Sequence, residues 1–218
     1  MMKLTLVATM ATYAAAFSPA RMDSSPRSTA LSAGGDTNGW TPNQDLPCYG
    51  LPGAPYSFMD PLGFTKNKSV SEVKRIREAE VMHGRVAMMA TMGYLIGEST
   101  PTIFYGTDVH HTIANNQLAE LPTGLLLPLF LGINFAEAYR ATKGWTEPGS
   151  KSLFTLRDTY YPGDLGFDPL GMKPTDPKAF SDMQDGELNN GRLAMLAAAV
   201  MCVQEQVTGH GILENLGL

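Results

Sequence analysis

The chain has 218 residues, which suits a single domain. Charged side chains make up only 17% of the residues and the net charge is −5. This composition gives no basic surface for nucleic acid, and it is poor in charge for a soluble helical bundle, which remains the alternative fold.

The N-terminal segment resembles targeting sequence rather than folded structure. Residues 1–16 combine Lys3 with an apolar run and a small-residue cleavage site, as a signal peptide does. Residues 17–31 contain Ser and Arg with a single acid, Asp23, which is typical of transit peptides. We therefore expect two import steps, as in the bipartite presequences of algal plastid proteins, and a mature chain of residues 32–218. A plain secretory signal followed by a linker is the alternative.

Two parts of the chain copy each other. FMDPLGF precedes EAEVMHGRVAMMA, and GFDPLGM precedes DGELNNGRLAMLA. The offset is 108 residues from Asp60 to Asp168 and 107 from His83 to Asn190. Two copies at a nearly constant offset indicate a pseudo-two-fold pair.

Each copy predicts a loop followed by a helix, at about 70–97 in the first copy and 180–207 in the second. Ser71 is the expected cap of the first helix, and Gly209 is expected to end the second. Between them, residues 121–141 form an apolar stretch of about 21 residues, long enough to span a membrane despite an internal proline.

The distribution of Lys and Arg predicts the topology. None of the 16 lies between Glu98 and Glu120 or after Arg192, whereas the segments before the first helix and between the second and third carry many. This asymmetry predicts an all-α membrane protein with three transmembrane helices and its N-terminus on the basic side. The first and third helices would then run the same way, crossed about a pseudo-two-fold axis along the membrane normal.

A polar cluster recurs on both repeat helices. An Arg five residues after a Glu points roughly 140° away from it, so the two are poorly placed to pair on one helix. Two crossed helices solve this, because each Arg can reach the Glu of the other helix. The geometry predicts a pair between Glu80 and Arg192. By symmetry it predicts a second pair between Glu187 and Arg85, with the glycine of each motif allowing close approach of the backbones.

A paired Glu keeps an oxygen lone pair, and a neutral His or Asn lies three residues further along the helix. Such groups suit the axial position of a magnesium ion whose plane is filled by a macrocycle. Ligands three residues apart would hold separate macrocycles, because no four of them converge as a bare metal site requires.

These motifs, each behind a DPLG loop, resemble the first and third transmembrane helices of chlorophyll-binding light-harvesting proteins. The presequence and the HGRVAM form resemble the fucoxanthin chlorophyll a/c-binding branch. The resemblance implies six chlorophyll ligands and three ion-pair partners: the ligands Glu80, His83, Glu137, Glu187, Asn190 and Gln204, and the partners Arg85, Arg192 and Arg140. Any bound metal would be chlorophyll magnesium.

Three of these assignments rest on the resemblance alone. Glu137 and Arg140 match an ExYR pattern on the middle helix, and Gln204 matches a further ligand position on the third. Related plant proteins also have an amide eight residues before that Glu, where this chain has Leu129. The DPLG loops resemble those that hold carotenoid end groups.

The resemblance implies a non-enzymatic antenna of the plastid thylakoid that binds chlorophyll a, chlorophyll c, fucoxanthin and other carotenoids. It would transfer excitation energy to a photosystem, with the photosystem core, neighbouring antenna subunits and thylakoid lipids as partners. The N-terminus would be stromal and the C-terminus lumenal. A photoprotective, energy-dissipating member of the family is one alternative, and a small membrane carrier is another.

The segment between the first two helices carries His110, His111 and Asp108, with Glu120 further along. A metal pair or a pH-responsive group would suit these residue types. An ordinary solvated loop is the simpler interpretation.

Overall fold

The computed structural model describes residues 40–53, 60, 62–65, 67–100, 113–147, 149 and 154–217. All of them belong to one compact unit, Gly34–Leu218. The predicted signal peptide and transit segment lie outside the described residues, as do Asp108, His110 and His111. The described part is helical, with loops and one isolated β-bridge between Trp145 and Leu156.

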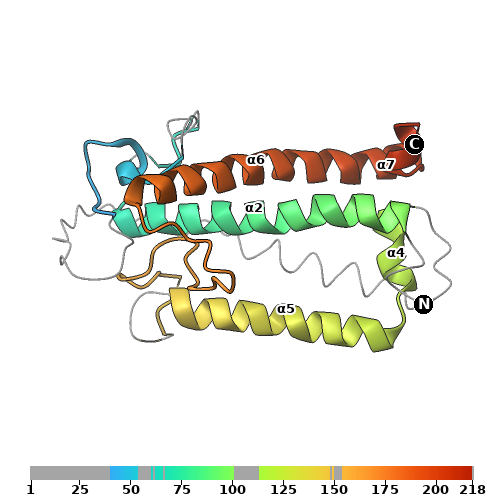
Figure 1. Ribbon diagram of the computed structural model, residues 1–218, viewed down its shortest axis with the longest axis horizontal. Helices are drawn as coiled ribbons and strands as arrows, with labels where there is room; N and C mark the ends of the chain where they lie inside the picture. The colour runs from blue at the N-terminus through green and yellow to red at the C-terminus, as the bar shows by residue number, and fades with distance from the viewer. Residues whose placement is uncertain are drawn as a thin grey trace. The chain divides into compact units, whose positions relative to one another are not determined.

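The helices follow in this order (Figure 1): η1 (Pro47–Gly50), α2 (Val70–Ser99), α4 (Ala114–Glu120), α5 (Thr123–Gly144), α6 (Pro177–Thr208) and α7 (Ile212–Asn215). Helices α2 and α6 lie side by side, and α5 runs alongside α2 without packing closely against it. Helix α5 is antiparallel to α2, because Arg140 near its end contacts Glu78 near the start of α2.

One end of the unit gathers the positive charge, and we call it the basic end. Helices α2 and α6 begin there and α5 ends there (Figure 1). Its described Lys and Arg residues include Lys68, Lys74, Arg75, Arg77, Lys143, Arg157, Lys173 and Lys178.

Helix α2 begins with a capping box. The backbone N–H of Glu72 donates to the Ser69 hydroxyl, and the Glu72 carboxylate accepts from the backbone N–H of Ser69. The prediction of Ser71 as the cap was wrong by two residues, because the Ser-to-Glu spacing of three is what closes both bonds.

Helix α6 begins earlier than predicted and ends where predicted. Asp176 accepts from the backbone N–H of Ala179 at 3.0 Å, and Pro177 follows in the first turn, where its lack of an N–H costs nothing. At the other end Gly209 has φ of 69°, a left-handed conformation that glycine adopts without strain.

Helices α2 and α6 cross in backbone contact. A Cβ added to Gly84 would lie 3.0 Å from the Cα of Gly191, and the reverse holds for Gly191. Ala87 and Ala194, one turn further along each helix, are also buried. Small residues thus bring the two backbones together over more than one turn.

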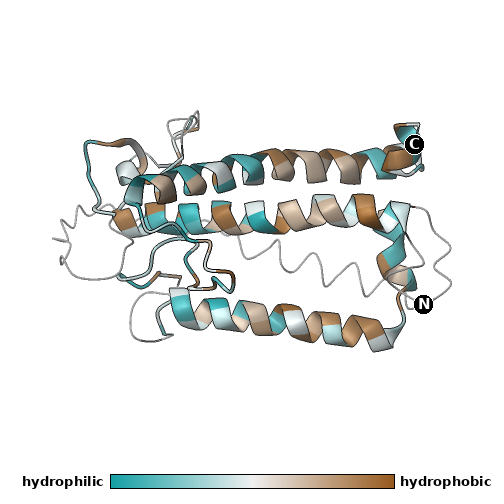
Figure 2. Cartoon of the chain, viewed as in Figure 1, coloured by the Kyte–Doolittle hydropathy of each residue, from teal (hydrophilic) through white to brown (hydrophobic). Residues whose placement is uncertain are grey.

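Away from the crossing, the helices carry apolar side chains outward. Brown residues gather in the half of α5 that lies next to α4 (Figure 2). Phe130 is 62% exposed, Leu131 51% and Phe135 74%. Large exposed apolar surfaces of this kind mark sites for lipid or ligand.

Hydropathy alone gives a weak membrane signal. Among the described helices, none passes a length and hydropathy test for a membrane span on its own. Only α4 and α5 together pass it, and these are joined through a bend of 109°.

Candidate functional site

The crossing of α2 and α6 is bracketed by two ion pairs. Arg85 Nε donates to Glu187 Oε1 at 2.6 Å, and Arg192 Nε donates to Glu80 Oε1 at 2.8 Å. Both pairs predicted from the sequence are therefore formed between helices. Each arginine uses one carboxylate oxygen. Glu187 keeps a second oxygen that could bind another group, whereas the second oxygen of Glu80 faces Arg77.

The surroundings of the two glutamates differ. Arg77 Nε lies 3.5 Å from Glu80 Oε2, and Arg77 also donates to the carbonyl of Pro52 at 2.7 Å. The Glu187 carboxylate has only Arg85 as an ion-pair partner in the described part of the chain. Its side chain is 36% exposed, against 26% for Glu80.

His83 is held in a defined tautomer. Its Nδ1 lies 2.6 Å from the carbonyl oxygen of Ala79, one turn earlier on α2. Because a carbonyl can only accept, Nδ1 carries the hydrogen and the lone pair of neutral His83 is on Nε2. The ring is exposed, so Nε2 can reach a magnesium ion outside the helix.

Asn190 occupies the matching position on α6. It is exposed and its side chain makes no hydrogen bond to any described residue. Gln204, further along α6, is partly exposed and its side-chain amide likewise has no partner in the described ranges. The structure thus groups Glu80, His83 and their α6 counterparts at the crossing, and leaves Gln204 apart from them.

The third carboxylate is on α5. Arg140 donates to Glu137 Oε2 from both Nε (3.0 Å) and Nη2 (2.7 Å). Glu137 Oε1 has no hydrogen bond within the described residues, and the side chain is 51% exposed. The pair that the ExYR resemblance implied is formed, with one oxygen left open.

Sequence reasoning missed Glu78, the most deeply buried side chain described. It is 1% exposed and accepts from Arg140 Nη1 at 3.3 Å, Tyr160 Oη at 3.0 Å and the backbone N–H of Gly163 at 2.7 Å. Burial and hydrogen bonding to Glu78 raise the pKa of the Tyr160 hydroxyl. This carboxylate joins α2, α5 and the loop before α6, and in sequence it looks like an ordinary charge on a helix.

A second pair of carboxylates closes the end of the unit opposite the basic end. Glu98 on α2 accepts from the first two backbone N–H groups of α7, at 2.8 Å each. Glu205 on α6 accepts from the first two of α4, at 3.1 Å each. The offset between Glu98 and Glu205 is the 107 residues of the repeat, a signal in the sequence that could have revealed both.

The two DPLG loops are built alike. Asp60 accepts from the backbone N–H groups four and five residues later, at 2.8 and 2.7 Å, and Asp168 does the same at 3.0 Å each. Gly63 and Gly171 both have a positive φ, of 68° and 63°. The backbone donors lower the pKa of both aspartates.

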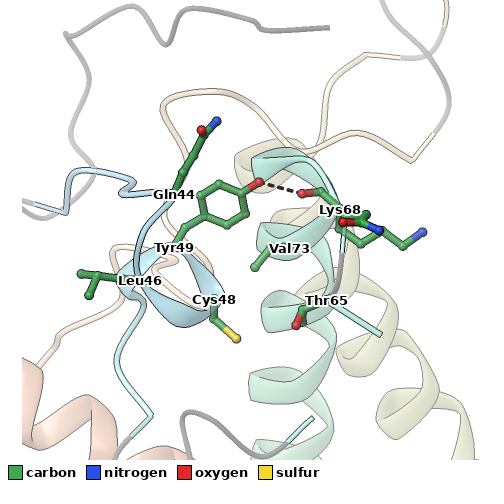
Figure 3. Close-up of a pocket in the computed structure, with 8 residues that line it drawn as sticks. Gln44, Leu46, Cys48, Tyr49, Thr65, Lys68 and Val73 are labelled. Carbon is green, nitrogen blue, oxygen red and sulfur yellow. Dashed lines mark hydrogen bonds between the residues drawn. The ribbon is translucent and has the colours of Figure 1, made fainter. Parts of the chain in front are cut away.

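A cavity of about 250 Å³ lies between η1 and the start of α2 (Figure 3). Two of its lining residues are joined by a hydrogen bond, in which the Tyr49 hydroxyl donates to the carbonyl of Lys68 at 2.7 Å. The lining residues are Gln44, Leu46, Cys48, Tyr49, Thr65, Asn67, Lys68 and Val73. None of the predicted ligands lines this cavity.

An apolar groove of about 500 Å³ follows the second half of α2. Its lining is Met88, Met89, Met92, Gly93, Ile96, Gly97 and Thr100. Methionine adapts to irregular shapes and glycine leaves the backbone accessible, so this surface suits a large flat or linear apolar ligand.

Known proteins resemble this chain over most of its length. A family model described as "Chlorophyll A-B binding protein" matches residues 47–206. The chain belongs to this family. It is 41% identical over 199 residues to the light-harvesting complex stress-related protein 3.2 of Chlamydomonas reinhardtii. The aligned region covers 88% of this chain and 74% of that protein.

Two further relatives extend the comparison. The fucoxanthin-chlorophyll a-c binding protein of Isochrysis galbana is 46% identical over 166 residues, 74% of this chain and 78% of that protein. Chlorophyll a-b binding protein 6 of Arabidopsis thaliana is 35% identical over 192 residues, 81% of this chain and 72% of that protein. As a member of the chlorophyll a-b binding family, the chain is a chlorophyll-binding light-harvesting protein.

The side chains at the site fit chlorophyll magnesium. Each candidate lies on α2, α5 or α6 and carries an oxygen or nitrogen of the type that serves as an axial ligand of magnesium. Within the described ranges, no three His, Cys, Asp or Glu side chains gather as they would around a bare metal ion. The pattern of isolated single ligands therefore suits several macrocycles, each held by one side chain.

Proposed function

We propose that this chlorophyll a-b binding protein is an antenna subunit that holds chlorophyll a, chlorophyll c and fucoxanthin and transfers excitation energy to a photosystem. The observation that carries the proposal is the reciprocal pair across the crossing. Arg85 and Arg192 neutralise Glu187 and Glu80 while leaving an outward ligand atom beside each.

The protein residues do the positioning. Bound chlorophyll and carotenoid supply the absorption of light and the exchange of excitation energy. The ion pairs and the glycine crossing fix α2 against α6, and Arg140 with Glu78 fixes α5 against α2. Glu80, His83, Glu137, Glu187, Asn190 and Gln204 are the proposed axial ligands, each on one of these helices.

We further propose that α2, α5 and α6 span the thylakoid membrane, with α2 and α6 related by a pseudo-two-fold axis along its normal. The gathering of Lys and Arg at the basic end, where α2 and α6 begin and α5 ends, supports this topology. The basic end would be stromal and the C-terminus lumenal. Residues 1–16 and 17–31 would be removed during import into the plastid, which N-terminal sequencing of the mature protein would test.

The choice of pigments and partners follows the relatives. A relative at 46% identity is named a fucoxanthin-chlorophyll a-c binding protein, which supports fucoxanthin and chlorophyll c here. The exposed apolar face of α5 would meet pigments and thylakoid lipids, and neighbouring antenna subunits and a photosystem core would receive the energy. The carrier alternative loses support, because the paired charges at the crossing are closed against each other.

The test is to refold the mature chain with extracted chlorophyll a, chlorophyll c and fucoxanthin, and to count the pigments bound per polypeptide. We expect a coloured complex in which light absorbed by carotenoid excites chlorophyll fluorescence. His83→Leu should remove one chlorophyll. Ile76→Leu, an exposed apolar change on the same helix that lines neither the cavity nor the groove, should remove none. A folded but colourless protein would overturn the proposal.

Energy dissipation is the second candidate function. The similarity to the stress-related proteins of Chlamydomonas reinhardtii, at 41% and 44% identity, favours it. The fluorescence lifetime of the pigmented protein separates the two: long lifetimes at pH 7 and pH 5 indicate harvesting, and a lifetime that falls severalfold at pH 5 indicates dissipation.

A further inference from the structure

Asn134 is a polar residue in the apolar part of α5 that the site described above does not use. Its Nδ2 donates to the carbonyl oxygen of Phe130, one turn earlier, at 2.7 Å. The carbonyl can only accept, so the amide nitrogen faces the helix and Oδ1 is the atom that remains. Oδ1 makes no hydrogen bond to any described residue, and the side chain is exposed.

His83 on α2 has the same arrangement. There too a side-chain N–H is bonded to the carbonyl four residues earlier, at 2.6 Å, and the remaining acceptor atom faces away. In both cases the helix satisfies the donor of the side chain and presents one neutral acceptor to the outside. An amide oxygen is also the proposed ligand type of Asn190, and it suits a hard cation such as magnesium.

The order of residues along the helices gives Asn134 the same position relative to its carboxylate neighbour as the other neutral ligands have. On α2 and α6, which run away from the basic end, the carboxylate comes first: Glu80 precedes His83 by three residues, and Glu187 precedes Asn190. Helix α5 runs toward the basic end, and its order is reversed: Asn134 precedes Glu137 by three residues. On all three helices a carboxylate paired with an arginine therefore lies nearer the basic end. The neutral acceptor follows about 4.5 Å further along the axis.

We propose that Asn134 Oδ1 is the axial ligand of a further chlorophyll magnesium, held on α5 beside the pigment of Glu137. The proposal rests on the proposed function, since it takes the same class of ligand. The three-residue spacing is the one by which Glu80 and His83 would hold separate macrocycles on α2.

The environment of Asn134 favours a macrocycle over lipid. Phe130, Leu131, Ile133 and Phe135 surround it on the helix and are 51–74% exposed. Against lipid chains, Oδ1 would remain without a partner, and an acceptor left unpaired in an apolar medium is unfavourable. A back-bonded amide does not strengthen a helix, so helix stability alone gives no account of this side chain.

The test uses the full mature chain refolded with chlorophyll a, chlorophyll c and fucoxanthin, comparing wild type with Asn134→Leu and Asn134→His. Leucine keeps the size of the side chain and removes the ligand atom, whereas histidine restores a neutral ligand. We expect Asn134→Leu to bind one chlorophyll fewer per polypeptide with unchanged carotenoid, and its difference absorption spectrum to show loss of one chlorophyll band. Asn134→His should recover the chlorophyll with a shifted band. Wild-type chlorophyll content in Asn134→Leu would overturn the proposal.

Two further variants separate this outcome from failure of the proposed function. Glu137→Ala removes the neighbouring proposed ligand, and its lost band should differ from that of Asn134→Leu. If His83→Leu and Glu137→Ala each lose one chlorophyll while Asn134→Leu loses none, the antenna function stands and the Asn134 site is wrong. If no variant changes the pigment content, the ligand assignment as a whole is wrong.

Discussion

The two repeats of this protein share a set of loop, ion-pair and cap interactions and differ in the side chains around them. In both, an aspartate closes the DPLG loop and an arginine pairs with a glutamate on the other helix. In both, a glutamate near the helix end also caps a short helix: Glu98 on α2 caps α7, and Glu205 on α6 caps α4. The carboxylates at the crossing differ, because Glu80 lies near two guanidinium groups and Glu187 pairs with one.

This difference indicates which interactions the helix crossing requires. The crossing needs a glycine on each helix and an arginine that reaches across, and both repeats provide them. Arg77 belongs to the first repeat alone, where it also ties α2 to the segment around Pro52. The first half of the site is thus anchored twice and the second half once, so the two halves should respond unequally to the same substitution.

The largest effect should come from breaking the backbone contact. Gly84→Leu would drive a side chain into Gly191, whose Cα lies 3.0 Å from the position of an added Cβ. We expect a loss of about 3 kcal/mol or more, as for severe overpacking, and loss of the pigments at the crossing. Gly186→Leu is the matched control, since nothing lies within 4 Å of a Cβ there. Thermal unfolding followed by chlorophyll circular dichroism would measure both, and equal midpoints would contradict the close crossing.

The next effect tests the inequality between the two ion pairs. Arg85→Leu leaves Glu187 without its cation, and we expect it to lose about 2–3 kcal/mol together with the pigment on Glu187. Arg192→Leu leaves Glu80 with Arg77 at 3.5 Å, so about 1 kcal/mol should be lost and the pigment on Glu80 should remain.

Chemical denaturation and the pigment count of each variant measure this difference. The double variant Arg77→Leu with Arg192→Leu leaves Glu80 without either cation. It should therefore lose stability and pigment as Arg85→Leu does at Glu187. The idea that Arg77 supports Glu80 fails if Arg85→Leu and Arg192→Leu are equally destabilising. Wild-type pigment content in Arg85→Leu would contradict the cross-paired site itself.

A smaller effect is expected at the opposite end of the helices. Glu98→Gln and Glu205→Gln each leave one acceptor oxygen where two carboxylate oxygens accept from the first turn of a short helix, and each should lose about 1 kcal/mol. Glu214→Gln, whose side chain is 62% exposed, is the control and should change stability by less than about 0.5 kcal/mol. Similar losses in the first two variants would extend the symmetry of the repeat to this end, and a neutral result for either would limit it to the crossing.

The sequence predicted the crossing better than the connections around it. Arg85 and Glu187 could be paired in advance because helical geometry directs an arginine away from the glutamate five residues before it, and the repeat supplied a second helix. Glu78 could not be recognised, because its burial depends on Tyr160 and Gly163, which are 82 and 85 residues away. Such a contact leaves no periodic pattern in the sequence.

Local rules account for the remaining differences. The Ser69 cap was missed although its spacing to Glu72 is a recognisable capping box. The repeat also contained the offset that links Glu98 to Glu205, but charged residues near helix ends suit a solvated surface equally well. The exposure of the α5 side chains could not be predicted, because an apolar helix buried in a protein core would have the same kind of sequence.

The smallest expected effect concerns the two DPLG loops at acidic pH. Asp60 and Asp168 have pKa values lowered by their backbone donors, so the ionised form is favoured in the folded loop. The stabilisation is therefore present above the ordinary aspartate pKa of 3.8 and is lost as the pH falls through the lower folded value. Asp60 also accepts from the Thr65 hydroxyl at 2.7 Å, a bond for which Asp168 has no equivalent among the described residues.

Thr65→Val should therefore make the first loop open at a higher pH than in wild type, without affecting the second. The change removes the hydroxyl donor and keeps the backbone N–H that also bonds to Asp60. Hydrogen exchange of the backbone amide at position 65 and of the Lys173 amide, measured between about pH 2 and pH 5 against unstructured peptides, would detect this, because the aspartate pKa values lie in that range. Unchanged protection of the first loop in the variant would show that the backbone donors alone set its acid limit.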